Sequence, residues 1–314
     1  MKQWLLVTVA VGTLSCASEG PLQGGTGGTL LGSGGDPSGS GGSAGGASGG
    51  GGASATGGAG TGGAATGGGP AVGGSLGSGG ATVAPGGTFT LRWEDNFDTI
   101  DTARWTAMTH SWDGNLAQFG AENATVSEGI LSVGLSAVEG ADKPYAGVEL
   151  RSVETLTFGK LEASVRFARG SAVVSSLVLI YTPWPPDDWN ELDIEFLGKN
   201  TDEIQFNHMV NIPPADPESG HVQYPELVPL AFDPAAEFHT YAIEWEPGEA
   251  RFFIDGMLYH TATEEMQRMV LPQNILLTIW ASDAVSWAGP VDETTAPTAA
   301  SYDWLRVYDY VPPP

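Results

Sequence analysis

From Thr88 onward, apolar and polar residues alternate with a period of two, and this pattern limits the chain to extended strands. The alternation is clearest in TFTLRWEDNF, GKLEASVRFARG, HTYAIEWEP and SYDWLRVYDY. Successive side chains of a strand point to opposite faces, so each segment offers one face to a core and one to solvent. ARFFIDGMLYHTA predicts a hairpin that turns at Asp255-Gly256, and TEEMQRMVL is the one short segment with a helical pattern. Many short strands with frequent turn residues predict an all-β sandwich or barrel.

The residues before Thr88 have a different character. Lys2 precedes an apolar run, WLLVTVAVGTLS, which is too short to span a bilayer and leads to Cys16, the only cysteine in the chain. We interpret residues 1–16 as a signal peptide in which TLSC resembles a bacterial lipoprotein processing site; an ordinary secretory signal is the alternative. Residues 17–87 hold most of the 46 glycines and bury too little apolar surface to fold, so they predict a disordered Gly/Ser-rich linker.

We expect a folded domain at residues 88–311, followed by a Pro tail at 312–314. The chain has 12 Lys+Arg and 37 Asp+Glu, a net charge of −25, which argues against nucleic acid or anionic lipid as a partner and fits a neutral or cationic substrate. A single cysteine permits no disulfide within the chain. If Cys16 carries lipid, the protein is an envelope lipoprotein of the outer membrane or cell surface that touches the membrane only through this anchor; otherwise it is secreted. We expect a monomer.

The segment NELDIEFLG places three acids at alternate positions, Glu191, Asp193 and Glu195. In a strand these side chains form a row on one face. The outer two Cα atoms then lie roughly 13 Å apart, and inward-leaning side chains bring the carboxyls toward the roughly 5–5.5 Å of a retaining glycosidase. The central acid would help to keep one neighbour protonated by repulsion. Two other interpretations stay open at this point: a solvated outer face, and a cation site.

The wider stretch DDWNELDIEFLGKNTDEIQFNHMVN resembles the active-site strand of family 16 glycoside hydrolases, and especially that of bacterial lichenases, the endo-β-1,3-1,4-glucanases. FDPAAEFHTYAIEWEPGEARFFIDG, YAGVELRS and ASYDWLRVYDY resemble other segments of the family, so the likeness covers about residues 90–310. It implies a β-jelly roll of two curved antiparallel sheets with a concave glycan cleft. It also implies that Glu191 is the nucleophile, Asp193 the assisting acid and Glu195 the general acid/base of a retaining endo-β-glucanase. The implied substrate is β-1,3-1,4-glucan, with β-1,3-glucan second.

The same resemblance implies further contacts to the glycan. Trp189 shares the face of the acids and offers an aromatic surface to a sugar ring; Asn207, Glu149, Arg151 and Trp280 match polar and aromatic residues of the family's cleft. Each has a structural alternative: a rim position for Trp189, a turn for Asn207, an ion pair for Glu149 with Arg151, and the core for Trp280.

No cofactor is expected to be required, although many relatives bind a structural Ca²⁺, for which Asp303 in SYDW matches a ligand position; the alternative is a surface acid.

Three positions depart from the lichenase pattern. Asn190 stands where Asp is common, Gly147 at a half-position of the lichenase disulfide, and Ala281 where Asn is frequent. These differences leave the linkage specificity open. A transglycosylase of the same fold, a non-catalytic surface glycan-binding protein and a purely structural envelope protein therefore remain as alternative functions.

Overall fold

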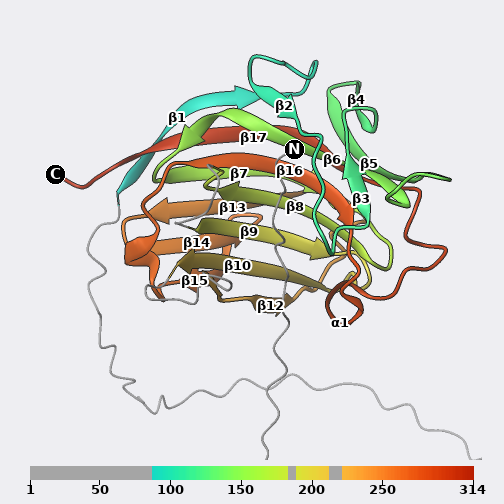
Figure 1. The fold of residues 1–314 in the computed structure, drawn as a ribbon. Helices are drawn as coiled ribbons and strands as arrows, with labels where there is room; N and C mark the ends of the chain where they lie inside the picture. Colours follow the sequence, from blue (N-terminus) through green and yellow to red (C-terminus); the bar gives the residue numbers. More distant parts are fainter. Residues whose placement is uncertain (1–86, 183–188, 212–220) are drawn as a thin grey trace, which may run out of the picture. The chain divides into compact units, whose positions relative to one another are not determined.

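The computed structural model describes residues 87–182, 189–211 and 221–314, and these form an all-β domain (Figure 1). The strands are β1 (Thr88–Asp95), β2 (Trp105–Ala107), β3 (Ala117–Phe119), β4 (Ala124–Ser127), β5 (Ile130–Ala137), β6 (Tyr145–Leu156), β7 (Gly159–Arg166), β8 (Val173–Ile180), β9 (Asn190–Leu197), β10 (Glu203–Asn211), β11 (His221–Gln223), β12 (Glu226–Pro229), β13 (His239–Glu246), β14 (Glu249–Ile254), β15 (Met257–Ala262), β16 (Gln273–Ala281) and β17 (Thr298–Val311). A 3₁₀ turn, η1 (Met266–Arg268), and a short helix, α1 (Val285–Ala288), complete the described elements. No helix in these ranges is long and apolar enough to cross a membrane.

The strands form two curled layers. In the front sheet, β6, β16, β8, β9 and β10 pair antiparallel in that order; β2 adds to β6, and β11 and β12 add to β10. In the back sheet, β17, β7, β13, β14 and β15 follow one another, while β1 and β5 share the other edge of β17 and β4 pairs with β5. Short pairings of β3 and β5 with β6 link the two layers. The expected jelly roll of two antiparallel sheets is confirmed.

Alternate residues of both sheets fill the space between them. On β9 the side chains of Leu192, Ile194 and Phe196 are fully buried. Phe196 stacks on Phe167, and Phe167 meets Tyr241 of the back sheet edge-on, with ring centroids 5.6 and 4.9 Å apart. Burying each large apolar side chain contributes roughly 1.5–3 kcal/mol, so a one-residue slip of β9 would be strongly unfavourable. The core thus fixes which face of β9 its acids occupy.

Two local expectations have different outcomes. The hairpin at Asp255-Gly256 is confirmed: β14 and β15 flank these residues, whose φ angles are 50° and 74°, as a type I′ turn requires. The helical pattern in TEEMQRMVL yields only the single 3₁₀ turn η1. Met266 and Met269 are buried there, so tertiary burial of two side chains explains the apolar spacing that suggested a longer helix.

Candidate active site

Strand β9 carries Glu191, Asp193 and Glu195 on the face opposite the core. Residues paired across the sheet share a face, and Glu195 lies between Ser176 of β8 and Gln205 of β10. Asp193 is only 1% exposed, and both glutamates are half-buried. The acids are therefore recessed, which does not fit the alternative of a solvated outer face.

The central acid, Asp193, has an unusual environment. Both of its oxygens are buried, and neither accepts a hydrogen bond from a described amide or hydroxyl group. Its partner is the carboxyl of Glu191, and two carboxyls can share a hydrogen bond only when one carries a proton. Burial, followed by the charges of Glu191 and Glu195, raises the pKa of Asp193 well above its usual range. The two carboxyls therefore share one proton, and burial together with the neighbouring charges favours its place on Asp193.

Glu191 receives two hydrogen bonds that favour its ionised form. The indole Nε1 of Trp189 donates to Glu191 Oε2 at 2.6 Å, and Asp193 donates the second. Burial raises the pKa of Glu191 to about 7, these two hydrogen bonds oppose the rise, and the charge of Glu149 adds to it. The ring of Trp189 stacks on that of His221, with the ring centroids 4.4 Å apart.

Glu195 is held from the neighbouring strand. Gln205 Nε2 donates to Glu195 Oε2 at 2.8 Å, and Trp287 Nε1 donates to Gln205 Oε1 at 3.0 Å. Burial and then the charge of Glu191 raise the pKa of Glu195 to about 8, with the Gln205 hydrogen bond acting in the opposite direction. Glu191 thus has two donors that favour its ionised form and Glu195 has one, an arrangement that suits an ionised nucleophile beside a proton donor.

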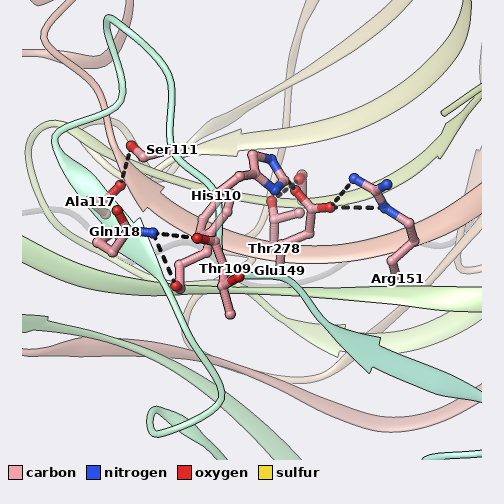
Figure 2. A network of polar contacts seen from close by, with 10 residues as sticks. Thr109, His110, Ser111, Ala117, Gln118, Glu149, Arg151 and Thr278 are labelled. Carbon is pink, nitrogen blue, oxygen red and sulfur yellow. Dashed lines mark hydrogen bonds and ion pairs between the residues drawn. The ribbon is translucent and has the colours of Figure 1, made fainter. Parts of the chain in front are cut away.

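A second polar group lies on the same face, across β8 and β16. Glu149 of β6 is 3% exposed; Arg151 Nη2 donates to its Oε1 at 2.6 Å, and His110 Nε2 lies 3.5 Å from Oε2 (Figure 2). Burial lowers the pKa of His110, against the raising effect of the Glu149 charge. Thr278 pairs with Glu149 in the register and exchanges a 2.5 Å hydrogen bond with Ser176, which continues a polar row toward Glu195.

Aromatic side chains border one end of this face. Trp280 of β16 is 8% exposed and lies on the same face of the sheet as Thr278. The centroid of its ring is 5.1 Å from that of Trp112 and 5.8 Å from that of Trp287. Trp280 was expected here from the sequence, whereas Trp112 was not. Asn207 is opposite Asp193 on β10 and accepts a hydrogen bond from the backbone N–H of Tyr224 at 3.1 Å. All five residues expected to contact glycan thus lie on the front sheet or beside its acids.

Three further positions are explained by packing. Asn190 points to the core side, where its Oδ1 accepts hydrogen bonds from the backbone N–H groups of Val270 and Leu271 at 2.8 and 3.0 Å. Its Nδ2 donates to the carbonyl oxygen of Trp189 at 2.7 Å, so the side chain anchors the start of β9. A Cβ at Gly147 would lie 2.5 Å from the carbonyl oxygen of Ile279, so close strand packing accounts for glycine there. Ala281 is fully buried.

A metal site finds little support among the described residues. Asp303 lies at a bulge of β17 and is half-buried. In the described part of the chain, no three His, Cys, Asp or Glu side chains gather as a metal-binding group. Ca²⁺ takes six to eight oxygen ligands, so a site at Asp303 would need backbone carbonyls, side-chain amides or water for most of them. Asp303 remains a prediction, as does Cys16, which lies outside the described residues.

Comparison with known proteins agrees with this fold. The family model "Glycosyl hydrolases family 16" matches residues 107–306. A beta-glucanase of Bacillus subtilis is 31% identical over 224 residues, which cover 70% of this chain and 86% of the relative. The crystal structure of a beta-1,3-1,4-glucanase (lichenase) from a mouse hindgut metagenome has a TM-score of 0.61 and 30% identity, covering 71% of this chain and all of that one. The beta-glucanase of Bacillus licheniformis has a TM-score of 0.60 and 28% identity, covering 69% of this chain and 97% of its own.

The protein is a glycoside hydrolase, an enzyme that acts on O-glycosyl bonds. More particularly, the chain belongs to glycosyl hydrolase family 16. The three acids of β9 come from the matched region, as do Trp189, Gln205 and Trp287.

Proposed function

We propose that the protein is a retaining endo-β-glucanase, with β-1,3-1,4-glucan as its first substrate and β-1,3-glucan as its second. The observation that carries the proposal is that two glutamates on one face of β9 have different hydrogen-bond environments. Glu191 receives hydrogen bonds from Trp189 and Asp193, whereas Glu195 has one donor, Gln205. Relatives described as beta-glucanases and a lichenase structure support the choice of glucan.

The reaction proceeds in two displacements. In the first, a Glu191 oxygen bonds to the anomeric carbon, while the C–O bond to the leaving sugar breaks and its oxygen takes the proton of Glu195. In the second, ionised Glu195 removes a proton from water, the water oxygen bonds to the anomeric carbon, and Glu191 leaves as a carboxylate. Asp193 donates a hydrogen bond to Glu191 and so stabilises the carboxylate that attacks and later departs.

The glycan must cross β9 between Glu191 and Glu195. Sugar units on one side then lie over β8, β16 and β6, toward Arg151 and Glu149, and those on the other side lie over β10, toward Asn207. This placement makes Trp189, Asn207, Glu149, Arg151 and Trp280 the contacts to substrate. His110 and Trp112, which adjoin Glu149 and Trp280, join this set from the structure.

The test is hydrolysis of barley-type glucan, laminarin, xyloglucan and agarose by the wild type and by Glu191→Gln. We expect reducing-end release from barley-type glucan, a β-anomer as the first product in NMR spectra recorded within the first minutes, and no turnover by the variant. An α-anomer as first product contradicts retention. Added acceptor oligosaccharide that captures most of the product would instead identify a transglycosylase, and binding without cleavage a glycan receptor.

We also propose that the enzyme is an exported monomer tethered through a lipidated Cys16. The apolar run before Cys16 and the Gly/Ser-rich segment after it support this proposal. Expression with a clickable fatty acid should label the wild type and leave Cys16→Ser unlabelled and released to the medium. Equal release of both proteins would refute the anchor.

A further inference from the structure

Two consecutive hydrogen bonds connect α1 to Glu195. Trp287 lies in α1, and its indole Nε1 donates to Gln205 Oε1 at 3.0 Å. The other end of the same carboxamide, Gln205 Nε2, donates to Glu195 Oε2 at 2.8 Å. The indole contacts the amide and makes no hydrogen bond to the acid itself, so any influence on Glu195 passes through Gln205.

The direction of these bonds follows from the chemistry of the groups. An indole N–H can only donate, whereas a carboxamide has one donor end and one acceptor end and can be turned either way. Trp287 therefore requires the oxygen of Gln205 and turns the NH₂ group toward Glu195. Gln205 is 8% exposed, so a misplaced amide would find little water to replace a lost partner.

We propose that Trp287 is a positioning residue that acts through the Gln205 carboxamide to keep a hydrogen-bond donor, never an acceptor, against the general acid/base Glu195. This inference rests on the proposed function insofar as Glu195 is the acid/base. The same glutamate must be protonated for the first displacement and ionised for the second. A fixed donor favours the ionised form and offsets part of the effect of burial. An amide free to turn would present its oxygen to the protonated acid and favour that form instead.

The other groups around Glu195 do not impose this preference. From its own strand come Glu191 and Asp193; β8 presents Ser176, β10 presents Gln205, α1 presents Trp287, and farther along the register β16 and β6 present Thr278 and Glu149. Among them, the charge of Glu191 favours the protonated form of Glu195 by repulsion. Among the described side chains, Gln205 is the one whose hydrogen bond acts in the opposite direction.

The test is the pH dependence of kcat/KM for Trp287→Phe. Phenylalanine keeps an aromatic ring beside Trp280 and removes the N–H donor together with part of the indole ring volume. We expect the alkaline limb to move up by roughly half to one pH unit, because the protonated form of Glu195 gains an acceptor. Gln205→Met should shift the limb in the same direction, and adding Trp287→Phe to Gln205→Met should produce no further shift, because the two residues act in series.

Trp112→Phe is the matched control, since Trp112 contacts Trp280 but not Gln205. This variant should change the maximal value of kcat/KM without changing the pH at which the alkaline limb falls. NMR titration of the Glu195 carboxyl carbon compares the pKa of Glu195 in wild type and Trp287→Phe without catalysis. This measurement therefore tests the inference even if no glucan is cleaved and the proposed function fails. An unmoved titration, or additive shifts in the double variant, would overturn the inference.

Discussion

Replacing Glu191 with Gln should stabilise the folded protein at pH 8 while abolishing turnover. The folded pKa of Glu191, about 7, lies above the value of 4.5 for a free glutamate, chiefly because of burial. Between these values the folded chain holds a proton that the unfolded chain has released. Stability therefore falls as pH rises through this window and stays low above it. Gln cannot ionise, so the variant escapes this loss.

The magnitude follows from the two pKa values. Each unit of difference corresponds to about 1.4 kcal/mol, which makes the loss at residue 191 about 1 kcal/mol at pH 5 and about 3 kcal/mol at pH 8. The advantage of Glu191→Gln should thus grow by about 2 kcal/mol between these pH values. For a domain of this size, that corresponds to a gain in Tm of roughly 4–8 °C.

The assay is thermal unfolding of wild type, Glu191→Gln and Glu139→Gln at pH 5 and pH 8. Glu139 is exposed and serves as the control for loss of one carboxylate, which should change stability by less than about 0.5 kcal/mol. The claim that buried charge at residue 191 destabilises the folded protein would be refuted if the gain in Tm of Glu191→Gln over the wild type were equal at both pH values. An equal gain for Glu139→Gln would refute it as well.

Three other changes have defined outcomes. Trp189→Phe removes a donor to Glu191, so the acidic limb of kcat/KM should rise by about one pH unit; an unmoved limb in a pH–rate profile would show that the indole N–H does not stabilise the carboxylate. Asn190→Ala leaves two backbone N–H groups without their acceptor and should cost about 1–3 kcal/mol in urea unfolding, whereas Asn190→Asp, which keeps an acceptor, should cost less. Gly147→Ala places a methyl 2.5 Å from the carbonyl oxygen of Ile279 and should lower stability by about 1–3 kcal/mol; a neutral result in the same urea series would mean that the strands separate easily.

The sequence was sufficient for features that depend on position along one strand. Alternation alone placed Glu191, Asp193 and Glu195 on one face, because Leu192, Ile194 and Phe196 had to enter the core. The same alternation accounts for neighbours on β10: His208 is buried opposite Leu192, whereas Asn207 lies on the acid face.

Contacts between distant segments could not be predicted in this way. Gln205 and Trp287 are 82 positions apart, and only the sheet register and the placement of α1 bring them together beside Glu195. The role of Asn190 was likewise hidden, because its partners, Val270 and Leu271, belong to a loop whose path depends on the packed core. The resemblance to the family indicated the three acids, but the hydrogen bonds around them depend on contacts between distant segments and so could be seen only in the folded structure.

The placement of β17 in the back sheet has a consequence for how the domain assembles. This 14-residue strand joins β7 on one side to β1 and β5 on the other, so that segments more than 200 residues apart in sequence become neighbours (Figure 1). Until residues 298–311 are in place, β7 and β5 each present an open edge able to pair with another chain. Such distant pairing makes folding slow, so the nascent domain depends on staying unaggregated until its final strand arrives.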